Sequence, residues 1–275
     1  MAIVYVDIYD LYFDKDIRPI KTKHRFAGAY RAKNFNSHDF EFDFKFTVLV
    51  NKGDGYELSI SSSNNICYIN LFLHIFEGRN HDIEYIIDYF NNKFSKLDDC
   101  NLLSNESNIY GNYLYITDVE KREIDELINE LEENGVTVQQ VGYTSSHFER
   151  GCSDWWGAYL LGLVTNWSSS AIQHTVMKVV NKYKNKFKKE YGSYVVLEHA
   201  RIEDKIIDYL CNYAKAEKEE LYLYSLESNG DNKVMQWRTR YQIFDVVASE
   251  SEIISLKTYP IAETYIVKDE IEQSN

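Results

Sequence analysis

The stretch Tyr113–Tyr143, YLYITDVEKREIDELINELEENGVTVQQVGY, decides the fold class of this chain. It opens with aromatic and β-branched residues at Tyr113–Thr117, which are typical of a strand. Apolar side chains then recur three and four positions apart, which places them on one face of a helix. These apolar positions are Ile124, Leu127, Ile128 and Leu131.

Both ends of this expected helix carry local signals. Thr117 and Glu120 have capping-box spacing at its start. Asn134 and Gly135 end it, because both tolerate the left-handed conformation of a helix C-cap. Val136–Tyr143 then returns as a strand. A strand, a helix and a strand within about thirty residues predict a right-handed βαβ unit.

A second, less regular strand–helix–strand arrangement follows near the C-terminus. It comprises a strand at Tyr194–Leu197, a helix and a strand at Leu221–Leu226. The apolar face of that helix is expected at Ile202, Ile206, Leu210 and Tyr213. The turn Glu227–Asn232 then predicts a β-hairpin, and Glu252–Tyr259 is expected to form a final strand. The layouts match but the residues do not, so support for an internal repeat is weak.

The N-terminal third is expected to be an antiparallel sheet with one helix. Aromatic side chains alternate with charged ones over Phe40–Phe46, and this period of two predicts a strand. The turn residues Asn51–Gly55 lead into Tyr56–Ser61, which is expected to pair back with it. Further strands are expected at Ile3–Phe13 and Ile66–Phe76. The helix is predicted from the apolar spacing of Ile83, Ile86, Ile87, Phe90 and Phe94, with Asn80 or Asp82 as its cap.

These patterns together predict an α+β (mixed α/β) fold. Residues 1–98 are expected to form an antiparallel β-rich domain with one helix, and residues 113–262 an α/β domain. The second domain would contain two βαβ-like units, a helical pair and a β-hairpin. Residues 99–112 are interpreted as a linker loop, and residues 263–275 as a polar tail.

The segment Trp155–Met177 carries no charged residue. Only Trp155–Val164 is strongly apolar, whereas a spanning helix needs about 20 mostly apolar residues. We therefore interpret the segment as a short buried helix followed by an amphipathic helix that ends near Tyr191. Two flanking tryptophans, and Ala158 and Gly162 four positions apart, leave a membrane-acting effector as an alternative.

Composition narrows the class of protein. The 275 residues carry a net charge of -13, with a pI of about 5.0. A negative field disfavours general nucleic-acid binding and favours basic partners. The four cysteines are widely spaced and the first residues do not resemble a signal peptide, so a cytoplasmic location is expected. Abundant Asn, Lys, Ile and Tyr suggest a low-GC bacterium or its phage.

The densest group of candidate catalytic residues lies in Ser145–Asp154. It contains His147, Glu149, Cys152 and Asp154. Cys152 with His147 could act as nucleophile and base, and the two carboxylates with His147 could hold a divalent metal. A polar loop that enters a buried helix is the structural interpretation. Because no recognised catalytic or phosphate-binding motif is present, no metal and no cofactor are expected.

Two basic patches are candidate binding surfaces. The segment Lys178–Lys189 contains six lysines, of which we single out Lys182, Lys186 and Lys189 as candidate binding residues. Arg238 and Arg240 form a second strip on an expected strand, with Trp237 on its other face. The alternative interpretation of both patches is ordinary solvent-exposed surface.

The leading functional hypothesis is an acidic cytosolic protein that acts by protein–protein interaction, of a toxin-neutralising or defence-related inhibitor type. Its partner would be a protein with a basic surface. The alternatives are a metal-dependent hydrolase or nuclease that uses residues 145–154, and a membrane-acting effector that uses residues 155–177. The sequence leaves the oligomeric state open.

Overall fold

The computed structural model describes most of the chain. The described residues are 2–14, 19–33, 35–49, 55–62, 66–76, 81–97, 110–117, 119–149, 153–164, 170–191, 195–201, 204–249 and 252–263.

One large sheet runs through the molecule. Its strand order is β5–β2–β1–β4–β3–β7–β8–β6–β9. Only β1 and β4 are parallel neighbours, and every other neighbouring pair is antiparallel. The strands are β1 (Ala2–Phe13), β2 (Pro19–Ala32), β3 (Tyr56–Ser62), β4 (Ile66–Ile75), β5 (Ser95–Lys96), β6 (Tyr110–Thr117), β7 (Thr137–Glu149), β8 (Ser153–Val164) and β9 (Val195–Arg201).

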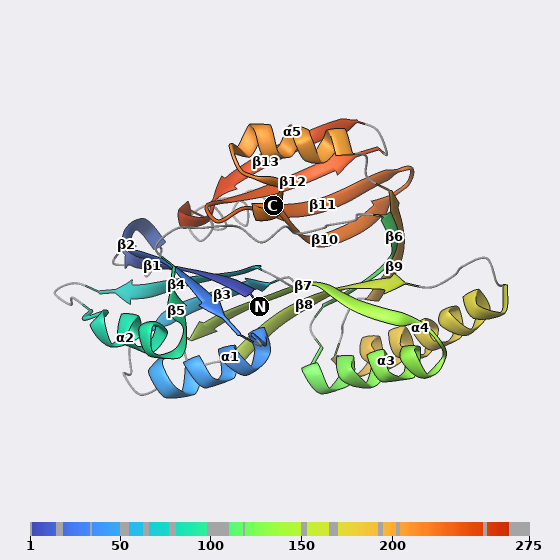
Figure 1. The fold of residues 1–275 in the computed structure, drawn as a ribbon, viewed down its shortest axis with the longest axis horizontal. Coiled ribbons are helices and arrows are strands. Elements are labelled where there is room, and N and C mark those ends of the chain that lie inside the picture. The colour runs from blue at the N-terminus through green and yellow to red at the C-terminus, as the bar shows by residue number, and fades with distance from the viewer. Residues whose placement is uncertain are drawn as a thin grey trace.

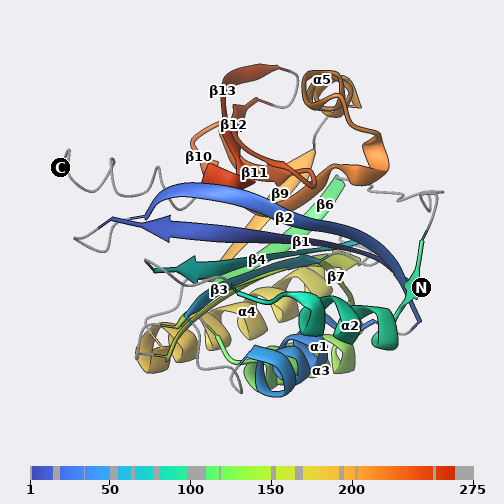
Figure 2. The same cartoon turned by 90° about the vertical axis from the view of Figure 1, so that its left-hand side faces the viewer.

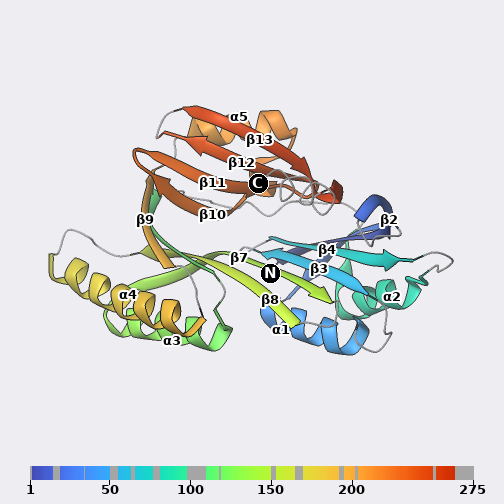
Figure 3. The same cartoon turned by 180° about the vertical axis from the view of Figure 1, so that it is seen from behind.

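The two faces of this sheet are covered differently. Four helices lie on one face, and a second, four-stranded sheet of order β10–β11–β12–β13 lies on the other (Figures 1 and 2). The four helices are α1 (Ser37–Phe44), α2 (Glu84–Lys93), α3 (Lys121–Glu133) and α4 (Ser170–Tyr191). The small sheet consists of β10 (Tyr222–Asn229), β11 (Asn232–Arg238), β12 (Gln242–Ala248) and β13 (Ile253–Pro260). Helix α5 (Asp204–Ala214) packs beside the small sheet, away from the other helices (Figure 3).

The fold is therefore α+β, as the sequence predicted. Its two expected halves share the large sheet, because β3 pairs with β7 from Glu57 opposite Phe148 to Ser62 opposite Tyr143. The boundary expected at residues 99–112 lies mostly outside the described residues. The division into two domains remains a prediction.

The predicted βαβ unit is part of a larger motif. Strands β6 and β7 are both antiparallel to β8, which lies between them, so they are parallel to each other but not adjacent. From β6 to β9 the chain follows the order β–α–β–β–α–β, with the strands arranged β9–β6–β8–β7. This is the split βαβ, or ferredoxin-like, arrangement. Helices α3 and α4 cover it on one face with an apolar core that includes Leu127, Val180 and Phe187.

The ends of α3 agree with the sequence in part. Gly135 has a φ of 82°, which confirms the predicted left-handed C-terminal turn. The predicted capping box at Thr117 is wrong, because the helix begins at Lys121 and its N-cap is Glu120, which makes no side-chain capping bond. At α2, the N-cap residue is Ile83, which makes no side-chain capping bond, so neither expected residue is the N-cap. Asp82, one position earlier, accepts a hydrogen bond at Oδ1 from the Glu84 backbone N–H.

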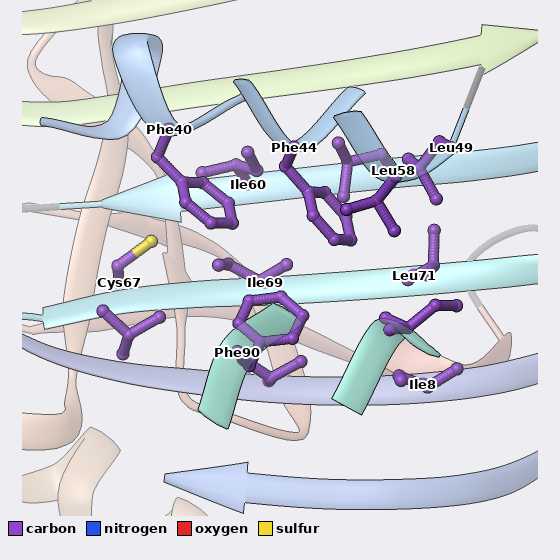
Figure 4. Close-up of a cluster of buried hydrophobic side chains, with 14 of the residues drawn as sticks. Ile8, Phe40, Phe44, Leu49, Leu58, Ile60, Cys67, Ile69, Leu71 and Phe90 are labelled. Carbon is purple, nitrogen blue, oxygen red and sulfur yellow. The ribbon is translucent and has the colours of Figure 1, made fainter. Parts of the chain in front are cut away.

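The strand predicted at Phe40–Phe46 is wrong. Residues Ser37–Phe44 form α1, and Lys45–Leu49 continue it as a π-helix. Phe40 and Phe44 are buried between α2 and the sheet, as Figure 4 shows, whereas Phe42 and Phe46 are 57% and 51% exposed. A spacing of four residues satisfies a helix face as well as a strand face, and Asn36 decides for the helix by accepting hydrogen bonds from two N–H groups of its first turn.

The short helix expected from Trp155 is also wrong. Residues Ser153–Val164 form β8, which pairs with β7 on one side and β6 on the other. A strand buried on both faces has a continuous apolar sequence and no period of two, so it resembles a buried helix. The amphipathic helix that follows is confirmed as α4. Among the described residues, no helix has both the length and the apolar character to cross a membrane.

The second expected βαβ unit is not one, because β9 belongs to the large sheet and β10 to the small sheet. The predicted hairpin is confirmed: β10 and β11 pair up to Asn229 opposite Asn232, across a two-residue turn. The strand expected to carry both Arg238 and Arg240 is shorter than predicted, because β11 ends at Arg238 and the chain turns back into β12 at Gln242. The last expected strand is confirmed as β13.

Candidate functional site

The candidate catalytic residues lie in a β-hairpin. His147 and Glu149 are the last residues of β7, and Asp154 is the second residue of β8. The expected loop over residues 145–154 is therefore mostly strand, with His147 paired opposite Trp155 and Glu149 opposite Ser153. Cys152 and the side chains of His147, Glu149 and Asp154 lie outside what the structure describes. Among the described side chains, no group of three His, Cys, Asp or Glu residues could hold a metal ion.

Two of the three singled-out lysines join α4 to α3. Lys182 Nζ lies 2.5 Å from the Glu130 carboxylate, and Lys186 pairs with Glu123. Lys186 also lies 3.4 Å from Glu126. These lysines lower the pKa values of Glu126 and Glu130 through hydrogen bonds to their carboxylates. Lys182 and Lys186 therefore form ion pairs between α4 and α3. Lys189, the third lysine, is exposed.

The arginine strip lies between the two sheets, so the expectation that it faces solvent is wrong for Arg238, which is only 2% exposed. Its guanidinium donates to Ser61 Oγ at 2.8 Å and to Asn70 Oδ1 at 2.9 Å. Trp237 is also buried. The two residues attach β11 to the core of the molecule.

Arg240 makes a matching contact to the first strand. It donates to both carboxylate oxygens of Asp7, at 2.8 and 3.2 Å, and Asp7 is 1% exposed. The Arg240 guanidinium also lies over the Tyr5 ring, 4.8 Å from its centre. Hydrogen bonding to Asp7 raises the pKa of Arg240, whereas its burial acts in the opposite direction and is the larger single effect. The pair fixes the small sheet on β1.

A pocket that the sequence did not indicate opens on the helical face of the large sheet. It has a volume of about 240 Å³. The starts of α1 and α3 form its walls, and β7 and β8 form its floor. Its lining residues are Phe35, Asn36, Ser37, His38, Ser62, Lys121, Gln140, Tyr143 and Tyr159. No local sequence motif indicates these residues, because they come from five separate segments of the chain.

A buried carboxylate supports the floor of this pocket. Glu41 on α1 accepts hydrogen bonds from Tyr143 Oη at 2.9 Å and from Ser145 Oγ at 2.7 Å. Burial raises the pKa of Glu41, and the two hydroxyl donors partly oppose that rise. Burial also raises the pKa values of Tyr143 and Tyr159, so both phenols are neutral. The arrangement positions α1 and the Tyr143 ring relative to each other.

The outer face of α5 presents a different kind of surface. Ile206, Ile207 and Leu210 are buried against the small sheet. Tyr209 and Tyr213 point away from this core, are 51% and 50% exposed, and stack on each other with ring centres 6.4 Å apart. The sequence placed Tyr213 on the apolar face of this helix. It lies at the border, since its ring also meets Phe244 edge-on.

Carboxylates surround these two tyrosines. Asp204 and Asp208 lie on the same exposed side of α5, and Glu217, Glu219 and Glu220 follow its C-terminal end. Together they outnumber the lysines of this segment, which are Lys205, Lys215 and Lys218. Burial raises the pKa of Cys211, and Asp208, Glu217 and Glu219 raise it further, whereas Lys218 lowers it, so charges of both signs lie near this residue.

Comparison with known proteins gives no relative: no protein-family model, curated protein or solved structure matches the chain.

Proposed function

We propose that this chain is a binding protein that recognises a protein partner with a basic surface through the outer face of α5. The observation that carries the proposal is the exposed stack of Tyr209 on Tyr213, set among carboxylates. Tyrosine is enriched at protein interfaces, because it offers a large rigid ring and a hydroxyl at small entropic cost. We define the tyrosine–acid face as Asp204, Asp208, Tyr209 and Tyr213.

The sign of the partner's charge follows from the local field. Carboxylates outnumber lysines in this segment by five to three, although Lys218 pairs with Asp204 at 3.0 Å. At the C-terminal end of α5, near Tyr213, the negative end of the helix dipole adds to them. The net charge of -13 acts in the same direction over longer distances. Such a field accelerates encounter with a basic partner and weakens as salt is added. A toxin-neutralising or defence-related inhibitor would use a surface of this kind.

The hydrolase or nuclease alternative rests on residues 145–154, of which the structure describes only the Ser145 side chain, and that hydroxyl is hydrogen-bonded to Glu41. The membrane-acting alternative rests on residues 155–177, which the structure divides between β8 and α4. Neither has a described contact in its favour, so the tyrosine–acid face is the better supported site.

The experiment is affinity capture from host lysate with three forms of the tagged chain, read by quantitative mass spectrometry. Wild type is expected to capture a basic protein that is released at high salt. Replacing the stack by Tyr209→Ser with Tyr213→Ser should reduce that capture at least tenfold, because the exposed rings are the proposed contact. A separate Asp208→Lys variant should weaken it at low salt, where steering is strongest.

The control is another exposed aromatic pair among the described residues. Phe42 and Phe46 are also four residues apart, exposed and in ring contact, but they lie on α1 and on the π-helix that continues it. Phe42→Ser with Phe46→Ser should leave capture unchanged. An equal loss of capture in both double variants would indicate nonspecific hydrophobic adsorption and would overturn the proposal. The proposal would also fail if wild type captured no partner that is released at high salt. In that case, the variants His147→Ala, Glu149→Ala and Asp154→Ala would test the enzyme alternative.

A further inference from the structure

We infer that the pocket between α1 and α3 is a binding site for a small, flat molecule that carries one anionic group. The helices α1 and α3, whose first residues line the pocket, lie on the opposite side of the large sheet from α5 (Figure 1), so this inference is independent of the proposed protein interface. Three features support it: the enclosure, the charge of the walls and the shape of the floor.

Segments that are far apart in the sequence enclose the pocket. Asn36–His38 at the start of α1 face the pocket together with Lys121 at the start of α3. Gln140 on β7 and Ser62 at the end of β3 add polar groups. Binding sites for small molecules combine a mostly preformed concavity with a few polar groups of this kind. Ser37 is buried and Asn36 is fixed by its capping bonds, so this wall is ordered before a ligand arrives.

The pocket wall carries one fixed positive charge. Burial lowers the pKa of His38 and the nearby Lys121 lowers it further, against the smaller opposing effects of Asp39 and Asp125, so the His38 imidazole is neutral at pH 7. Lys121 supplies the ammonium group, and the positive end of the α3 dipole lies at the same point. Its described acidic neighbour is Asp125, 3.5 Å away in a partly exposed pair of the kind that is worth little. A ligand anion can therefore compete for the Lys121 ammonium.

Aromatic rings contribute to the lining of the pocket. The Tyr143 and Tyr159 rings have centres 5.0 Å apart and are tilted by 50°, and the two residues are only 1% and 4% exposed, so they offer ring edges to a ligand. The partly buried Phe35 adds a third ring, and the Glu41 contact holds the Tyr143 hydroxyl beneath the floor. Aromatic surfaces of this kind prefer stacked or edge-on contacts with another ring.

The size of the pocket limits the ligand. Sites for drug-sized molecules start at about 300 Å³, and this pocket is smaller at about 240 Å³. The volume fits a single ring with one carboxylate, or a comparable planar acid, in contact with Lys121. A full dinucleotide or a peptide helix would not fit.

The test measures thermal stability with benzoate, its neutral analogue benzamide and inorganic phosphate, each at millimolar concentration. A ligand that binds only the folded chain raises the melting temperature, and the rise increases with the logarithm of the ratio of ligand concentration to Kd. Benzoate is expected to bind at least tenfold more tightly than either benzamide or phosphate, because only benzoate offers both a ring and a charge. Saturation-transfer NMR should show the benzoate ring protons in contact with the protein.

Two neighbouring variants locate the binding. Lys121→Met should weaken benzoate at least tenfold. Arg122→Met is the matched control, because Arg122 is the next residue of α3 but its side chain is 81% exposed and does not line the pocket. Equal binding by both variants would overturn the inference. So would a failure of benzoate to stabilise the wild type, or stabilisation by benzamide to the same extent.

Discussion

Glu41 is an acidic residue that α1 buries almost completely, at 1% exposure. Both hydroxyls that reach it, from Tyr143 and Ser145, lie more than a hundred positions further along the chain. Asp7 depends in the same way on Arg240, which comes from the other end of the chain. The sequence shows which residues are ionisable, but only the fold brings such distant partners together, so the pocket and both buried networks could not be predicted.

Glu41→Gln should change how stability depends on pH. The folded state raises the pKa of Glu41, so it keeps a proton that the unfolded chain has already lost. Stability from this group is therefore fully present below its ordinary pKa of 4.5 and falls as pH rises toward the raised value. The Gln variant does not titrate. As pH increases over this range, the free energy of unfolding of the Gln variant should rise relative to that of wild type.

Urea unfolding of both proteins in steps from about pH 4 to about pH 8 measures this difference. Asp39→Asn on the exposed side of α1 serves as the control for general charge effects. A gap between wild type and Glu41→Gln that stays constant, or widens in favour of wild type with rising pH, would contradict the prediction.

Single elements were predicted well where a pattern has one interpretation. The spacing of apolar residues in α2, α3 and α4 fits only a helix, and the turn before β11 fits only a hairpin. The failures are patterns with two interpretations. Phe40 and Phe44 suit either element, and the apolar run of β8 has no period at all. In both cases tertiary packing decides, because each segment takes the form that its neighbours can bury.

Phe44→Ala and Phe42→Ala test the helical assignment of this segment. Phe44 is fully buried against Phe90, and its loss should cost about 3–5 kcal/mol of unfolding free energy. Phe42 is 57% exposed, and its loss should cost less than about 0.5 kcal/mol. Chemical denaturation measures both values. Equal losses are what a strand with all its aromatic residues on one face would give, and they would refute α1.

At the scale of the whole molecule, contacts between distant segments link the sheets. Tyr222 on β10 donates to the Ser62 backbone carbonyl of β3, and Arg238 on β11 contacts Ser61 and Asn70. Composition and element types were enough to predict an α+β class. The order of the strands could not be predicted from the sequence, because β2 was not recognised and strand pairing over such distances leaves no local signal.

A fragment of residues 1–98 should not fold cooperatively by itself. It lacks β7, which covers the edge of β3, and it lacks both arginines that pair with its buried polar groups. Circular dichroism during urea titration should show a gradual change for the fragment and a sigmoidal one for the full chain. A sigmoidal transition of the fragment would instead establish the expected N-terminal domain.

The central position of the β3–β7 pair also has a consequence during translation. The ribosome completes β1 to β4 well before it reaches β7, so the free edge of β3 emerges first and has no partner. An uncovered strand edge is a template for pairing with another chain. The nascent protein is therefore most exposed to misassembly between the synthesis of these two strands, and a chaperone that shields the β3 edge would act in that interval.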